Sequence, residues 1–125
     1  MDAKSRDTPR VLVVEDEYFI ADDCAKVLID LGCQVAGPFG RLEEAMQFLD
    51  EGEKIDGALL DVNLHGSAVY PLLEKLLAMK IPIALYTGYG PDYLPEQFRS
   101  IPIFTKPEPT CQAAEYICNR VKQCY

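Results

Sequence analysis

The sequence alternates short apolar runs with amphipathic helical segments, and this alternation occurs five times along the chain. The apolar runs are rich in β-branched residues and too short for helices, which is typical of buried parallel strands. The expected strands cover residues 10–14, 33–38, 57–61, 81–86 and 101–105. Between them apolar residues recur at helical spacing, as Ile20, Cys24 and Val27 do in the first segment. Five such units predict an α/β fold with a parallel sheet covered by helices on both faces.

Local stop and start signals set the expected helix ends. Gly32 is expected to end the first helix. Ser67 is expected to cap the third helix, with Pro71 in the first turn, where proline is tolerated. The inner face of that helix would consist of Val69, Leu72, Leu73, Leu76 and Leu77. Prolines leave room for only a short helix in residues 91–100, and a final helix is expected to begin near Thr110.

The expected architecture is a single domain. Residues 1–9 are expected to form a flexible N-terminal tail and residues 10–125 the folded domain, because 125 residues suffice for one core. A doubly wound (βα)5 sheet of this kind takes the flavodoxin-like strand order 2-1-3-4-5, which we adopt as the expected order. Ligands bind such sheets at the carboxyl ends of the strands, beside the point where the strand order reverses.

Charge and cysteine content exclude several classes of function. A net charge of −8 argues against a nucleic-acid partner, because phosphate backbones are bound by clustered Lys and Arg. No signal peptide and no apolar run of about 20 residues is present, so we expect a cytoplasmic protein without a membrane partner. The five cysteines form no CxxC pair and no zinc spacing with His65, which we expect in a solvated loop. Cys24, Cys111 and Cys118 are expected to act as small hydrophobic residues on helix faces.

Polar side chains stand at the carboxyl ends of four expected strands. The first strand is followed by Glu15 and Asp16, and the third ends in Asp61. The fourth leads into Thr87 and the fifth into Lys106. In a parallel sheet all five side chains lie at one edge, where three close carboxylates repel one another and favour a bound cation. Mg²⁺ fits best, because it accepts carboxylates, water and a phosphate oxygen as ligands.

Three residues at this edge have more specific expected roles. Asn63, two residues after Asp61, offers its backbone carbonyl as another oxygen ligand. Lys106 supplies a positive charge suited to phosphate or to Asp61. The Thr87 hydroxyl is able to donate a hydrogen bond to a phosphoryl oxygen.

This set of residues resembles the receiver domains of response regulators. The matching segments are residues 11–17, 60–64, 86–88 and 105–107, in order and on the expected strands. The resemblance implies that Glu15 and Asp16 hold Mg²⁺ and that Asp61 accepts a phosphoryl group from the phosphohistidine of a histidine kinase. It also implies a switching role for Thr87 and a cis Lys106–Pro107 peptide bond.

The implied function is that of a stand-alone response regulator in a two-component phosphorelay. Its partners would be a histidine kinase or a histidine phosphotransfer protein, and a downstream protein that the sequence does not identify. It would signal by protein–protein contact or by passing the phosphoryl group on, and it would not be an enzyme with a turnover substrate. The sequence leaves the oligomeric state and the phosphate lifetime open, although Asn63 and Tyr89 flank the site where family members tune hydrolysis.

The sequence departs from the family pattern at one position. Most receivers carry Tyr or Phe three residues before the lysine, where this chain has Ile103, and Phe104 is expected to face the other way. The segment 85–90 partly resembles the alphaproteobacterial FAT GUY receivers, which lack that aromatic residue. We therefore expect switching through movement of the loop and helix after the fourth strand. The alternative is a phosphorylation-independent pseudo-receiver that acts as a protein-binding module.

Two other classes share part of the pattern. A flavodoxin-like redox protein would need a loop rich in hydroxyl groups and glycine after the first strand, and residues 15–17 are acidic instead. A phosphatase of the haloacid dehalogenase type would need an aspartate in place of Asn63.

Overall fold

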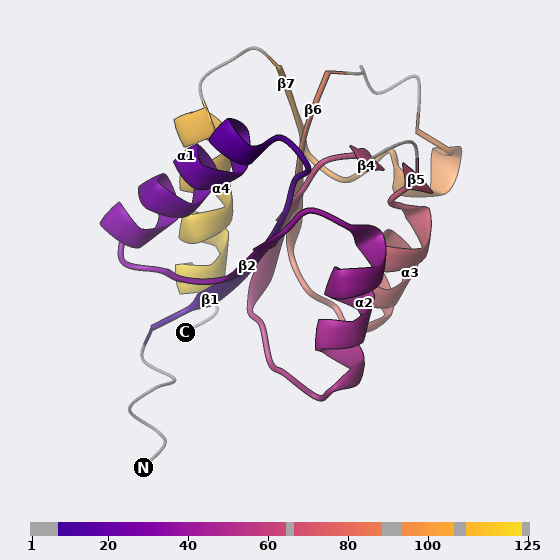
Figure 1. Cartoon of the computed structure of the whole chain (residues 1–125), viewed down its shortest axis with the longest axis horizontal. Coiled ribbons are helices and arrows are strands. Elements are labelled where there is room, and N and C mark those ends of the chain that lie inside the picture. The colour runs from indigo at the N-terminus through magenta and orange to yellow at the C-terminus, as the bar shows by residue number, and fades with distance from the viewer. Residues whose placement is uncertain (1–7, 65–66, 89–93, 107–109, 124–125) are drawn as a thin grey trace.

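The computed structural model describes residues 8–64, 67–88, 94–106 and 110–123, and its elements alternate between strand and helix (Figure 1). In chain order they are β1 (Arg10–Val14), α1 (Tyr18–Asp30), β2 (Gln34–Phe39), α2 (Leu42–Asp50), β3 (Gly57–Leu60), β4 (Asn63–Leu64), β5 (Ser67–Ala68), α3 (Tyr70–Ala78), β6 (Ile83–Thr87), the 3₁₀ helix η3 (Glu96–Phe98), β7 (Ile103–Thr105) and α4 (Thr110–Gln123). Among these elements, no helix is long and apolar enough to cross a membrane.

The main sheet has five strands in the order β2-β1-β3-β6-β7, and all neighbouring pairs are parallel. This is the expected order 2-1-3-4-5, so the predicted α/β fold is confirmed. The chain first builds outward from β1 to β2 and then crosses back to β3. The order therefore reverses between β1 and β3, which places a binding crevice at the carboxyl ends of these two strands.

Helices cover both faces of the sheet, as Figure 1 shows. The alternation of side chains along β1 sends Val11 and Val13 into a core shared with α1 and α4. Leu12 and Val14 face the opposite core, which is shared with α2, α3 and η3. Each fully buried leucine or valine side chain contributes about 1.5–3 kcal/mol through removal of apolar surface from water.

The described cysteines belong to this packing. Cys24, Cys33 and Cys118 are free thiols, and all three are buried. Burial raises the pKa of Cys24 to about 12 and that of Cys33 to about 12, so both side chains are neutral at physiological pH. The prediction that Cys24 and Cys118 serve as small hydrophobic residues is confirmed, whereas the side chain of Cys111 lies outside the described part of the chain.

Helix ends follow one pattern with one exception. After α1 and α2 the chain turns through Gly32 and Gly52, with φ values of +94° and +86°, as expected of glycine in the left-handed region. The equivalent position after α3 is Lys80, whose φ is +61°. The Lys80 N–H donates to Leu77 O at 3.0 Å, and the Ile81 N–H donates to Leu76 O at 3.0 Å. These two bonds close the end of α3 in the way that a glycine usually permits.

Two expectations about the α3 region were wrong. Ser67 does not cap α3, because it belongs to the short antiparallel pair β4–β5, and Val69 precedes the helix without a side-chain cap. Leu77 is 42% exposed instead of facing the core. The short helix expected within residues 91–100 is the single turn η3, and Pro71 lies in the first turn of α3 as predicted.

Candidate functional site

The acidic residues after β1 and β3 are held by hydrogen bonds that extend the sheet beyond the strands. The Glu15 N–H donates to Phe39 O of β2 at 2.9 Å. The Asp61 N–H donates to Val14 O of β1 at 2.9 Å. Each acid is therefore fixed by the neighbouring strand, so that their side chains start from a rigid backbone.

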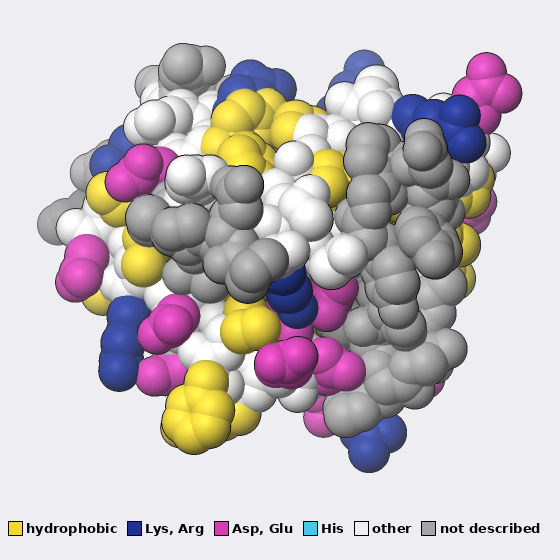
Figure 2. All heavy atoms as spheres, turned by 90° about the horizontal axis from the view of Figure 1, so that it is seen from above, with side chains coloured by type: hydrophobic (Ala, Val, Ile, Leu, Met, Phe, Trp, Pro, Cys, Tyr) yellow, Lys and Arg dark blue, Asp and Glu magenta, His cyan; other side chains and the backbone are white. Residues whose placement is uncertain are grey.

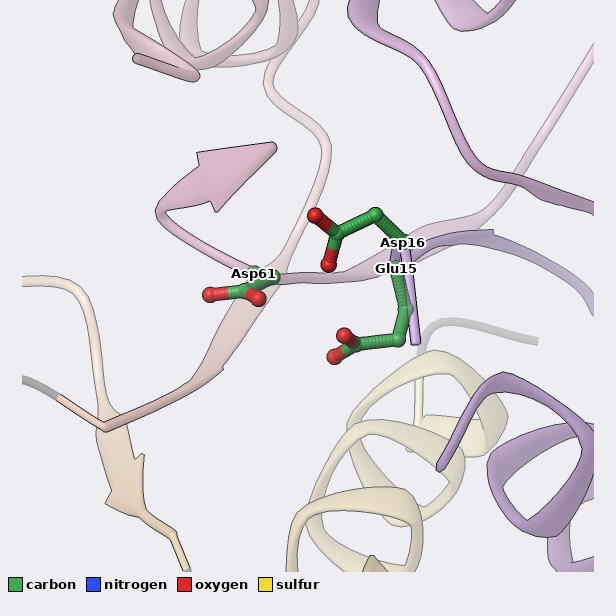
Figure 3. Close-up of side chains that lie close together, drawn as sticks. All are labelled: Glu15, Asp16 and Asp61. Atoms are coloured by element: carbon green, nitrogen blue, oxygen red, sulfur yellow. The ribbon is translucent and has the colours of Figure 1, made fainter. Parts of the chain in front are cut away.

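Three carboxylates converge at this edge of the sheet. One carboxylate oxygen from each of Glu15, Asp16 and Asp61 lies within 4.8 Å of the others. Glu15 and Asp61 are buried, and Asp16 is half-buried. Figure 3 shows the side chains of Glu15 and Asp16 extending from one segment toward the side on which Asp61 lies, on a neighbouring segment. The sequence prediction that these three side chains meet is confirmed by their geometry.

Lys106 is the cation of the site. Its Nζ lies 3.1 Å from Glu15 Oε1 and 3.2 Å from Asp61 Oδ2. Nζ also lies over the ring of Tyr86, 5.6 Å from its centroid. Seen along the strands in Figure 2, acidic side chains gather around a basic side chain on this face. The ammonium group thus bridges the two buried acids across the point where the strand order reverses.

Thr87 connects β6 to the same lysine. It is the last residue of β6 and is almost completely buried. Its carbonyl oxygen accepts a hydrogen bond of 2.7 Å from the Lys106 N–H. A movement of Thr87 would therefore be transmitted to the backbone that carries the ammonium group.

Burial and mutual charge shift the ionisation of this cluster. Burial raises the pKa of Glu15 to about 7, and the negative charge of Asp61 adds to the increase. Hydrogen bonds from the Glu17 N–H and from Lys106 oppose the shift without cancelling it. Burial lowers the pKa of Lys106, but Asp61 and Glu15 outweigh that effect and leave it raised. The lysine is therefore positively charged at neutral pH.

The donor set fits a hard divalent cation. It consists of carboxylate oxygens on a rigid backbone, with one half-buried member that keeps the site open to solvent. Glu15, Asp16 and Asp61 are the residues that would hold the ion. Asn63 begins β4, and the role of its backbone carbonyl as a ligand stays a prediction.

An exposed aromatic pair beside the acids was missed by the sequence analysis. Tyr18 and Phe19 open α1, with 74% and 80% of their surfaces exposed, and their rings lie edge to face at 5.4 Å. A hollow of about 250 Å³ separates Tyr18 from Pro38 and Gly40 and is also lined by Glu15 and Asp16. The available signal was the helical period of α1, which places both aromatic residues off the buried face marked by Ala21, Cys24 and Leu28.

The position of the missing switch aromatic is filled by a core residue. Ile103 packs against the core shared with α2 and α3, and Phe104 points to the opposite face. There the Phe104 ring lies 5.7 Å from the ring of Tyr116 in α4. The expectation that the two side chains face opposite ways is confirmed. The predictions for His65, Tyr89 and the Lys106–Pro107 peptide bond concern residues outside the described part of the chain.

Known proteins resemble the chain in structure. A scan of protein-family models gives no match, and a sequence comparison with curated proteins gives none either. SdrG from Sphingomonas melonis Fr1 is 30% identical with a TM-score of 0.76, and the match covers 92% of this chain and 97% of that one. The BeF3-activated conformation of SdrG from Pseudomonas melonis Fr1 is 32% identical with a TM-score of 0.71, covering 90% and 95%.

A third structure extends the likeness. The PhyR response regulator REC domain from Erythrobacter litoralis is 26% identical with a TM-score of 0.76, and the match covers 92% of this chain and 91% of that domain. At these coverages the similarity concerns the whole domain and not one motif.

Proposed function

The chain belongs to the receiver domain family of response regulators, and from this premise we propose that it accepts a phosphoryl group on Asp61 in a two-component phosphorelay. The donor would be the phosphohistidine of a histidine kinase or of a histidine phosphotransfer protein. The chain would then signal by contact with a downstream protein or pass the phosphoryl group on. It acts as a signalling domain and not as a classical enzyme.

The observation that carries this proposal is the double contact of Lys106. Its ammonium group reaches both Glu15 and Asp61, while the third carboxylate, Asp16, lies within 4.8 Å of them. A purely structural ion pair needs only one acid for one lysine, and gathering two more carboxylates costs free energy through repulsion. Such an arrangement is favoured where the acids bind a cation and one of them reacts with a phosphoryl group.

The chemistry is a nucleophilic substitution at phosphorus. A carboxylate oxygen of Asp61 attacks, the P–N bond of the phosphohistidine breaks, and an acyl phosphate forms while the imidazole leaves with a proton. Lys106 is placed to stabilise the negative oxygens of the transferring group, and Thr87 to donate a hydrogen bond to one of them. When bound by Glu15, Asp16 and Asp61, Mg²⁺ would supply further neutralisation of negative charge.

The exposed aromatic pair supports a protein donor. Tyr18 and Phe19 follow the acids closely in sequence. Tyr18 lines the hollow beside Asp16, and the ring of Phe19 contacts the ring of Tyr18. Exposed aromatic residues are enriched in protein–protein contacts because they bury a large area at a low entropic cost. We assign to them contact with the surface that carries the phosphohistidine.

The alternative, a phosphorylation-independent binding module, is favoured by Ile103. A core aliphatic residue at this position removes the rotating aromatic that most receivers use. The two functions differ in whether Asp61 reacts, so one experiment separates them.

Intact-mass spectrometry after incubation with acetyl phosphate and Mg²⁺ tests the proposal. We expect a mass increase of one phosphoryl group on the wild type, absent in Asp61→Asn and after chelation of the metal. Asp30→Asn is the matched control, because Asp30 is an exposed acid at the far end of α1. If the wild type forms no adduct and binds no beryllofluoride, under conditions that label a known receiver, the binding module becomes the better conclusion.

A further inference from the structure

A second hollow lies at the end of the sheet opposite the acids. It has a volume of about 320 Å³ and lies between the end of α3, the segments that lead into β6 and β7, and α4. Its apolar walls include Leu77, Ile81, Pro102 and Tyr116. The volume is within the range of sites for small molecules.

Two cations stand at the edge of this hollow. Lys80 and Arg120 both line it, and no Asp or Glu is among the described residues that do. Both side chains are exposed, and within the described part of the chain neither forms an ion pair. In a chain of net charge −8, a hollow whose described charged lining residues are both cations is complementary to an anion.

The backbone at Lys80 gives an independent observation. The equivalent positions after α1 and α2 are Gly32 and Gly52, whereas Lys80 adopts a φ of +61° with a full side chain. A left-handed conformation is less favourable for a non-glycine residue than for glycine. The free energy of folding is therefore less favourable with lysine than with glycine, which points to a use for the side chain itself.

We propose that this hollow binds a small organic anion. The apolar body of the ligand would lie against Leu77 and Tyr116, and its carboxylate, sulfonate or phosphate group would contact Lys80 and Arg120. The size of the hollow favours a small molecule, and the negative charge of the whole chain disfavours a nucleic acid. The site is separate from Asp61 and its binding does not depend on phosphorylation.

The probe is 8-anilinonaphthalene-1-sulfonate, an aromatic sulfonate whose fluorescence increases in apolar surroundings. We expect saturable binding to the full chain without metal or phosphodonor, at one site. In ¹⁵N-resolved NMR spectra the amide signals that shift should belong to residues 77–81, 83, 100–101, 116 and 120. Lys80→Gln and Arg120→Gln should each weaken binding about tenfold, which is the effect of losing a hydrogen bond to a charged group.

Lys80→Gly distinguishes a ligand-binding side chain from a structural one. We expect it to weaken binding like Lys80→Gln while raising the unfolding temperature by roughly 3 °C, because glycine relieves the backbone strain. Lys54→Gln removes an exposed lysine outside the hollow and should leave binding unchanged. The proposal is overturned by non-saturable binding, by shifts located elsewhere, by unchanged affinity in the Lys80 and Arg120 variants, or by an equal loss in Lys54→Gln.

Discussion

The two ends of the sheet differ in where their charges lie. At the carboxyl ends of the strands, Glu15 and Asp61 are buried with a single ammonium between them, and the pKa of Glu15 is raised to about 7. At the opposite end, Lys80 and Arg120 are exposed at the edge of a hollow that is also lined by Leu77 and Tyr116. Burying like charges costs free energy, whereas exposed cations cost little. This difference fits the two proposals, phosphoryl transfer at the first end and anion binding at the second.

The largest expected effect is on the rate of phosphorylation. It is tested by replacing one lysine with glutamine at each end of the sheet. Lys106→Gln removes the ammonium that contacts Glu15 and Asp61, so phosphorylation by acetyl phosphate should slow about 100-fold, as when a group that stabilises a transition state is lost. Lys54→Gln makes the same change near the start of β3 and should leave the rate as it is. The rates are measured by intact mass over time. Equal rates in Lys106→Gln and the wild type would show that the lysine is only structural.

The next largest effect is on the free energy of unfolding, and it tests the packing near the amino ends of the strands. A Cβ atom at Gly57 would lie 2.5 Å from Val121 Cγ1 and 3.2 Å from Ile117 Cγ1, so the packing of these α4 side chains on β3 must shift in Gly57→Ala. We expect a loss of about 2 kcal/mol in the free energy of unfolding, or roughly 30-fold in the unfolding equilibrium, measured with urea. Phosphorylation of the folded variant should be unaffected.

Gly40→Ala is the control for this packing effect. The nearest atom to a Cβ at Gly40 is Glu15 O at 4.0 Å, so we expect a change within about 0.5 kcal/mol. Equal stability of the Gly57 and Gly40 variants would contradict the close packing of α4 on β3.

The smallest effect concerns the surface beside the acids. Phe19→Ala should slow transfer from a phosphorylated histidine kinase about tenfold more than it slows labelling by acetyl phosphate, because only the protein donor contacts the ring. Ile29→Ala removes another exposed apolar side chain, 58% exposed, at the other end of α1, and serves as the control. Equal slowing with both donors would locate the effect of Phe19 in the acid site itself.

The site was predictable because strands end where polar residues begin. Glu15, Asp61 and Thr87 each follow an apolar run directly, and Lys106 follows one after Thr105. Parallel pairing then leaves all four at one edge. The strand order completed the prediction, since it makes β1 and β3 neighbours. This part of the structure depends on side-chain polarity alone, which a sequence displays directly.

Other features depend on geometry that polarity does not encode. The pair β4–β5 is held by backbone pairing over two residues per strand, which is too short to produce a side-chain periodicity in the sequence. Ser67 was therefore predicted to be a helix cap instead of a strand residue. Helical spacing could not decide whether Leu76 or Leu77 faces the core, because adjacent residues differ by only about 100° around the helix. The left-handed backbone conformation of Lys80 could not be predicted from the sequence either, because lysine rarely adopts it.

Because Lys106 contacts Glu15 and Asp61 together, it also sets the charge balance at this edge. Above pH 7, three carboxylates face one ammonium, and the remaining two negative charges equal the charge of one divalent ion. In the proposed phosphorylated state Asp61 gives up its carboxylate charge while the phosphoryl group adds about −1.5 to −2. The net change is therefore only about one charge. A partner protein would then recognise new hydrogen-bond acceptors and their positions more than a change in electrostatic potential.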